Sequence, residues 1–366
     1  MSAYTIRMAL DGDDTGIRQL LGAPQPSGLL ALGFERSPNY FDAAAVTHEA
    51  PEVIVAEQKA AGDIVAVVNM GSRPAYVNGE CQPVRFGGDL RIAPSHQGGR
   101  LLVYLSRRIR EAIGEHGWYQ TIILNDNSRS RTAFDSGGRA GMPVYVPQGT
   151  VETFTLTGIR RPVAFADCVV RVATAQDVPA MNRFVRRMGR FYQFLPAYDF
   201  SGVLAHSPYF RGLSITDFLL VEREGDLAGL GAVWNQKAFK QTRVVSYQPA
   251  VRFVRPIYNL WTRLTGGMHL PPEGQLLDYC LAHSPLTAPE DADAMSVLLH
   301  ALWERCQAKG GRALSLSFSG SDPRRSVISN FRHFSMTGIH YLAGFSSESL
   351  PRLDERLVPY FECGRL

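Results

Sequence analysis

Short apolar runs separated by turn residues organise the first half of the chain. Four of them have the length and composition of strands in a buried sheet, and Asn78-Gly79 is a typical hairpin signal. The predicted strands lie at 52–57, 63–71, 89–92 and 119–124, with a hairpin at 75–80. A helix is predicted over 98–114, because apolar residues recur there at helical spacing and form one face: Leu101, Leu102, Leu105, Ile109 and Ile113.

The second half shows a similar order. Strands are predicted at 216–223, 228–235, 275–282, 312–318, 337–345 and 357–363, and an amphipathic helix at 291–309. Alternation of strands and helices in both halves predicts the α/β (α+β) fold class, with helices packed on sheets.

A weak internal repeat divides the chain. Ile6-Arg7-Met8-Ala9 is followed by Asp13, and Val170-Arg171-Val172-Ala173 is followed by Asp177 at the same spacing. Each segment predicts a short strand and then a helix that opens on an acidic residue. A repeat at this spacing indicates duplication, and 366 residues suit two domains. We expect the domains to span 1–162 and 163–366.

A loop and a later polar segment carry a family resemblance. The strand at 89–92 ends in Ile92-Ala93-Pro94, and Gln97-Gly98-Gly99-Arg100 then opens the predicted helix. After the next strand stand Asn127, Phe134 and Gly138. This layout resembles the GCN5-related N-acetyltransferases (GNAT), whose loop reads R/Q-x-x-G-x-G/A. The resemblance implies two tandem GNAT domains, each a mixed, mostly antiparallel sheet flanked by helices.

The resemblance also implies a cofactor-like co-substrate, acetyl-CoA or another acyl-CoA, bound by the first domain. Glycines let a backbone approach a pyrophosphate closely, and a helix start offers free N–H groups and a positive dipole end. Arg100 and Leu102 depart from the family's small residues. The expected acyl-CoA-binding residues are Leu90, Ile92, Gln97, Gly98, Gly99, Arg100, Leu101 and Asn127.

Acyl transfer to an amine needs a base, a donor that polarises the carbonyl, and a route to protonate the leaving thiolate. Backbone N–H groups from Leu90 to Ile92 would polarise the carbonyl. Asp89 is the favoured base because it lies on that strand, with Glu80 and His96 as further candidates. Phe134 occupies the position of the family's acidic tyrosine and has no proton to give, so Tyr145 is the expected replacement.

The second half keeps the strand order but not the loop. The segment 282–291 has no glycine, and its helix opens with Glu290, Asp291 and Asp293. These acids stabilise the helix dipole and repel a pyrophosphate. We therefore expect this domain not to bind CoA.

Charge and cysteine content narrow the function. A net charge of +4 suits an anionic ligand and is too low to favour nucleic acid. Five dispersed cysteines without a CxxC pair predict no metal site and a reducing, cytoplasmic location. No segment has the roughly 20 apolar residues of a membrane span, so no membrane partner is expected.

We therefore predict an acyl-CoA-dependent N-acyltransferase acting on an amine of a small molecule or peptide. Two alternatives stay open. An aminoacyl-tRNA-dependent (Fem-like) transferase also pairs two such domains and would explain the altered loop. A non-catalytic CoA-binding module would explain Phe134. The oligomeric state cannot be predicted from the sequence.

Overall fold

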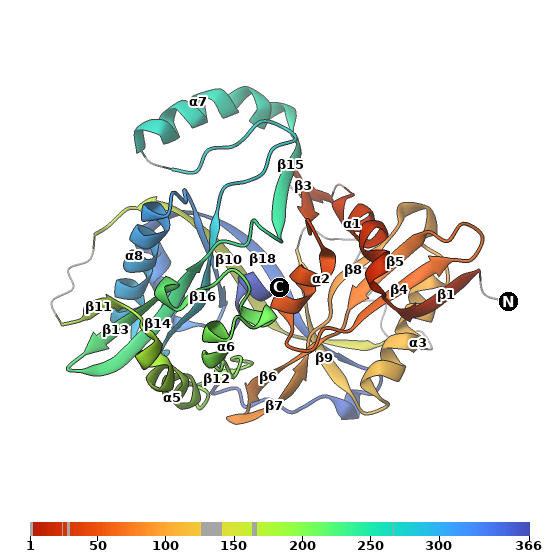
Figure 1. Ribbon diagram of the computed structural model, residues 1–366, viewed down its shortest axis with the longest axis horizontal. Coiled ribbons are helices and arrows are strands. Elements are labelled where there is room, and N and C mark those ends of the chain that lie inside the picture. Colours follow the sequence, from red (N-terminus) through yellow and green to blue (C-terminus); the bar gives the residue numbers. More distant parts are fainter. Residues whose placement is uncertain (1–2, 24, 28–29, 126–140, 163–166, 266) are drawn as a thin grey trace.

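The computed structural model describes residues 3–23, 25–27, 30–125, 141–162, 167–265 and 267–366. Figure 1 shows two α/β halves side by side, with the N-terminal half at the right and one helix, α7, projecting from the body. Asn127, Phe134 and Gly138 lie outside the described residues.

The first half is built on a four-stranded antiparallel sheet of order β1-β4-β5-β8. Alternate residues of β4 and β5 pack on opposite faces. Helices α1 and α2 cover one face of the sheet, and α3 covers the other. The elements are β1 (Tyr4–Met8), α1 (Asp14–Gly22), α2 (Tyr40–Thr47), β4 (Val53–Gln58), β5 (Ile64–Asn69), β8 (Gly88–Ile92), α3 (Leu101–Ile113) and β9 (Trp118–Leu124).

The second half contributes most of an eight-stranded sheet of order β11-β13-β14-β16-β17-β10-β18-β9. Helix α8 packs on one face of this sheet and α5 on the other. The elements are β11 (Val169–Val172), α5 (Val178–Met188), β13 (Phe218–Arg223), β14 (Asp226–Trp234), β16 (Cys280–Thr287), α8 (Ala292–Ala308), β17 (Leu314–Ser319) and β18 (Phe331–Gly344).

The halves share strands. β10 (Val144–Ile159) belongs to the first half in sequence but pairs with β17 and β18 of the second half, and β18 in turn pairs with β9. A small sheet, β15-β3-β2, also joins segments from both halves. The remaining elements are β2 (Gln25–Ser27), β3 (Leu30–Glu35), β6 (Ser72–Val77), β7 (Glu80–Arg85), β12 (Tyr192–Gln193), α6 (Ser201–Leu204), β15 (Gln241–Tyr247), α7 (Pro249–Thr265) and β19 (Val358–Pro359).

The repeat seen in the sequence recurs as matching ion pairs. Arg7 of β1 binds Asp13 at 2.6 Å and Glu57 of β4 at 2.8 Å. In the second half Arg171 of β11 binds Asp177 at 2.8 Å and Glu222 of β13 at 2.7 Å. Each arginine thus fastens its strand to the neighbouring strand and to the start of the following helix.

Two predicted strands of the second half were misplaced. The strand expected at 275–282 lies at 280–287, because residues before it leave the main sheet to contact β15, with the Leu277 N–H donating to Thr242. The strand expected at 357–363 is limited to β19, and the chain then turns into a 3-10 helix at Cys363–Arg365.

Candidate active site

A gap between two neighbouring strands marks the candidate site. β8 and β9 run parallel and meet near their starts, where the Gly87 N–H donates to the carbonyl of Gln120 at 2.7 Å. From there β8 continues in the four-stranded sheet and β9 in the eight-stranded sheet, so the strands diverge. The glycine loop leaves from the end of β8 that lies beyond this contact.

A β-bulge interrupts β8 inside the opening. Gly88 pairs with Asn69 of β5, and Arg91 pairs with Val67. Two residues of β8, Asp89 and Leu90, therefore lie opposite a single residue of β5 and form the bulge. Asp89 adopts the left-handed conformation, with φ 53°. Bulges take backbone groups out of the ladder and are common beside active sites. The Leu90 N–H, predicted to polarise the acyl carbonyl, belongs to this bulge.

The loop after β8 ends at an open helix start. The Gln97 side chain donates to the Ile92 carbonyl at 2.9 Å and closes the turn, and Gly98 has φ 77°. Gly98, Gly99 and Arg100 are exposed, whereas Leu101 is buried. Within the described part of the chain, Arg100 makes no side-chain hydrogen bond that caps α3. The first N–H groups of the helix thus lack a side-chain cap.

Asp89 is held by two residues that flank the start of α2. Arg36 donates to Oδ1 at 3.1 Å, and the Tyr40 hydroxyl donates to Oδ2 at 3.2 Å. Burial alone would raise the pKa of Asp89, but the charges of Arg36 and Lys240 and the hydrogen bond from Tyr40 outweigh it and lower this pKa. The carboxylate is therefore ionised at neutral pH, which suits it better to hold an ammonium group than to remove its proton.

Lys240 brings a second titratable group to Asp89 from the other half of the chain. Its ammonium donates to the main-chain oxygens of Leu366 at 2.8 Å and Gly364 at 3.4 Å. Burial and the charge of Arg36 lower the pKa of Lys240 from 10.5 to about 7, although Asp89 acts in the opposite direction. Sequence analysis missed this residue because no local motif marks it, and only tertiary contacts place it near Asp89.

Tyr145 lies at the base of the opening. Its hydroxyl is 3.0 Å from that of Tyr119, which belongs to β9. A Cβ added at Gly87 would lie 3.1 Å from the Tyr119 ring, so the start of β8 packs directly on this ring. Burial raises the pKa of both tyrosines well above its usual value, which keeps both hydroxyls protonated.

The structure does not bring the other two candidate bases to the bulge. Glu80 is exposed at the tip of the β6–β7 hairpin, paired with Val77. The run of β7 from there to Arg85 covers roughly 17 Å before β8 begins. His96 has its Nδ1 2.9 Å from the Tyr4 hydroxyl, on the side of the sheet where α3 contacts β1.

Comparison with known proteins rests on structures, since no model of a known protein family and no curated protein sequence matches the chain. A GCN5-related N-acetyltransferase from Sphaerobacter thermophilus matches with a TM-score of 0.58 over 98% of this chain and 99% of its own, at 12% identity. Saccharomyces cerevisiae N-myristoyltransferase with bound myristoyl-CoA matches with a TM-score of 0.60 over 93% and 83%, at 10% identity. The chain has a tandem GNAT fold.

A third match is the GCN5-related glucosamine N-acetyltransferase region of a fungal multi-domain GH3 β-N-acetylglucosaminidase, with a TM-score of 0.58 over 93% of this chain and 38% of that one, at 12% identity. The structural matches establish the tandem GNAT fold. At identities this low they do not establish the reaction, which is argued from the site itself.

The second half of the tandem GNAT fold has a corresponding opening, but the chain's own residues fill it. β16 and β17 pair in parallel at two positions and then diverge, and β16 has a bulge at Ser284, where φ is 46°. The Ser284 N–H donates to the carboxylate of Glu362 at 2.9 Å, and Arg365 contacts His283 at 2.7 Å. Glu362 and Arg365 are fully buried there. The second bulge residue is Pro285, which has no N–H to offer.

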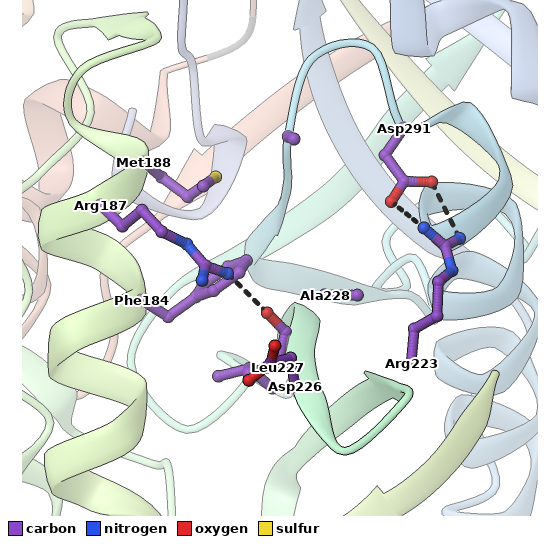
Figure 2. Close-up of a pocket in the computed structure, with 9 residues that line it drawn as sticks. Phe184, Arg187, Met188, Arg223, Asp226, Leu227, Ala228 and Asp291 are labelled. Atoms are coloured by element: carbon purple, nitrogen blue, oxygen red, sulfur yellow. Dashed lines mark hydrogen bonds and ion pairs between the residues drawn. The ribbon is translucent and has the colours of Figure 1, made fainter.

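The helix start of this half is also occupied. Asp291 accepts a hydrogen bond from the Ala294 N–H at 3.0 Å and so caps α8 with an internal carboxylate. Beside it lies a pocket of about 230 Å³ (Figure 2). Arg223 at its rim is held by both oxygens of Asp291, and Arg187 donates to the Leu227 carbonyl at 2.7 Å. The arginines of this pocket are therefore engaged within the protein.

Among the described residues, no group of three or more His, Cys, Asp or Glu side chains is arranged to hold a metal ion.

Proposed function

We propose that the protein is an acyl-CoA-dependent N-acyltransferase with its site in the opening between β8 and β9. The observation that carries this proposal is the contrast between the two openings of the fold. In the first half the bulge residues, the glycine loop and a helix start that its N-cap residue leaves uncapped all follow the point where β8 and β9 diverge. In the second half the equivalent groups are used by Glu362 and Asp291 or, at Pro285, are missing.

Each part of a thioester has a complementary group in this opening. The N–H groups at the start of α3, with Gly98, Gly99 and Arg100, suit a pyrophosphate. The Leu90 N–H suits the oxyanion that forms when an amine attacks the thioester carbonyl. Asn127, predicted to contact the acyl-CoA as well, lies outside the described residues.

Three side chains are assigned to the proton transfers. Asp89 holds the ammonium form of the acceptor, and Lys240 takes its proton, since its pKa of about 7 leaves a large neutral fraction at physiological pH. The free amine attacks the thioester carbon, and the C–S bond breaks as the amide forms. The thiolate takes a proton from Tyr145, and the proton that the amide nitrogen loses returns to the Tyr145 phenolate. The acceptor in this proposal is an amine of a small molecule or peptide.

The acyl group is proposed to be acetyl, as in the two matched acetyltransferases. The matched yeast enzyme holds myristoyl-CoA, so a long acyl chain is the alternative to be compared. Acetyl-CoA and myristoyl-CoA should therefore be titrated in parallel.

Thermal unfolding with and without acyl-CoA tests the proposal. A ligand at 100 times its Kd stabilises the folded protein by about 2.7 kcal/mol. Gly99→Glu should abolish this stabilisation by adding bulk and negative charge beside the pyrophosphate. Gly99 is the right position because a Cβ there meets no atom of the described residues within 4 Å, whereas Gly98 has a positive φ and any side chain would strain it.

Gly12→Glu is the matched control, since Gly12 is equally unobstructed and lies outside the opening. Equal stabilisation of Gly99→Glu and wild-type protein would place the site elsewhere. Stabilisation by aminoacyl-tRNA and not by acyl-CoA would favour the Fem-like alternative. Stabilisation by acyl-CoA without release of free thiol, across a panel of amines, would favour a binding module.

A further inference from the structure

Helix α7 carries an exposed apolar face. The helix projects from the body in Figure 1. Phe253, Ile257 and Leu264 are 82%, 72% and 83% exposed, which is unusual for large apolar side chains. At 100° per residue the exposed apolar side chains form one continuous stripe along the helix: Phe253, Val254, Ile257, Leu260, Trp261 and Leu264. We call this stripe the α7 ridge.

The other face of α7 packs on the protein body, and this packing sets the orientation of the ridge. The Tyr258 ring lies 6.5 Å from that of Phe334 on β18, and Thr262 is fully buried. Asn259 binds both the N–H and the carbonyl of Leu270, at 2.9 and 2.8 Å. The helix is therefore anchored to the body by its polar and aromatic face. The ridge faces away from the body, except that Trp261 at its edge also contacts Arg332 beneath the helix.

The charges on and around α7 are almost all positive. Arg252 and Arg263 lie along one edge of the ridge, Arg255 stacks on Tyr247 at 5.6 Å, and the helix sequence contains no Asp or Glu. Among the described residues, Glu273 forms an ion pair with the helix, 3.4 Å from Arg252. An apolar stripe with aromatic residues, flanked by arginines, is typical of helices that lie in a membrane interface.

A basic pocket opens directly under the helix. It has a volume of about 320 Å³ and lies between α7 and strands β10 and β18. Tyr258 and Trp261 line it from the helix, and Arg160, Arg332 and His333 line it from the strands. The pocket thus places positive side chains at the depth where phosphates would lie if the ridge entered the acyl region of a lipid layer.

We propose that α7 binds the surface of anionic phospholipid membranes, with the ridge in the interface and the arginines on lipid phosphates. The proposal is independent of the acyltransferase function. It does not require a spanning segment, and no helix among the described residues is long and apolar enough to cross a membrane. A helix of 17 residues is about 25 Å long and suits an orientation in the membrane plane. A second copy of the chain fits less well, because α7 offers no acid for the other copy's arginines.

Vesicle binding by the full-length protein tests this directly. The protein should sediment with vesicles of phosphatidylcholine and phosphatidylglycerol, and much less with phosphatidylcholine alone. Ile257→Glu/Leu264→Glu should lower the partition coefficient at least about tenfold, because it puts charge into the interface. Arg252→Ala/Arg263→Ala should lower it about fivefold for each arginine, on the anionic vesicles. Leu10→Glu is the matched control, since Leu10 is a 66% exposed apolar residue elsewhere.

Tryptophan fluorescence gives a second readout at the ridge itself. Trp261 is half exposed, whereas Trp234 and Trp303 are buried and the partly buried Trp118 lies in β9, where it contacts Phe194, and not on α7. Vesicles should therefore shift the emission of wild-type protein to the blue, and Trp261→Phe should remove most of the shift while binding persists.

Three results would overturn the proposal. The first is no binding of wild-type protein to anionic vesicles. The second is binding that Ile257→Glu/Leu264→Glu leaves unchanged. The third is a wild-type dimer, seen by light scattering, that the same variant converts to a monomer without any vesicle binding, which would assign the ridge to a second copy of the chain.

Discussion

Removing the amino group of Lys240 should make the protein more stable and less active at neutral pH. Burial and the charge of Arg36 lower the pKa of Lys240 from 10.5 to about 7. Between these pH values the unfolded chain binds a proton that the folded chain does not. The stability of the wild-type protein should therefore rise with pH across this window, and Lys240→Met should remove that rise.

The size of the effect follows from the two pKa values. From pH 7 to pH 9.5 the wild-type protein should gain about 3 kcal/mol relative to Lys240→Met, an upper value because water reaches the half-buried side chain. At high pH the wild-type protein should be more stable than Lys240→Met. The variant leaves the main-chain oxygens of Gly364 and Leu366 without their donor, which costs about 1–3 kcal/mol at every pH.

Urea denaturation at several pH values measures this difference, with Lys59→Met as a control for the loss of one positive charge at an exposed position. If Lys240 is the base, kcat/KM of the wild type should rise with pH to a plateau above about pH 7, and the variant should lose about 10²–10⁴-fold. Stability curves of wild type and variant that stay parallel from pH 7 to 9.5 would refute the assigned pKa. Unchanged turnover in the variant would remove Lys240 from the mechanism while leaving the pKa intact.

Two further substitutions test other parts of the site. Tyr145→Phe keeps the ring contacts with Tyr119 and Tyr341 and loses the hydroxyl contact with Tyr119 at 3.0 Å. Its stability should fall by about 1 kcal/mol and its kcat by about 10²–10⁴-fold, and steady-state assays that show full turnover would leave water as the proton donor. Glu362→Gln breaks a buried charge cluster with Arg365 and should lower the free energy of unfolding by about 3–5 kcal/mol without opening a second CoA site. A second site in isothermal titration would contradict the latter expectation.

Local signals explain what the sequence predicted well. The order of strands and helices in the first half, the Asn78-Gly79 hairpin, and the succession from Ile92 through the glycine loop to Leu101 all depend on neighbouring residues. Periodicity and turn chemistry act over the same short range, so the loop and helix start were placed without knowledge of the rest of the chain.

Long-range contacts explain which residues of the site could not be predicted from the sequence. Arg36, Asp89 and Lys240 are far apart in sequence, and no spacing rule connects them. Glu80 was a candidate because it precedes the loop strand, but the hairpin carries it away from the bulge. Helix α7 was overlooked although its pattern is amphipathic, and its apolar face does not enter a core as periodicity normally implies.

The shared strands determine how the asymmetry between the two openings can be studied. β10 lies between β17 and β18, and β18 lies between β10 and β9. A fragment that begins after residue 162 would lack β10 and expose the edges of two long strands, which favours aggregation over an independent domain. Failure of such a fragment to bind CoA would therefore say little about its opening. The intact chain answers the question, because it keeps Glu362 and Asp291 in the second opening. We therefore expect isothermal titration to give one acyl-CoA per full-length chain.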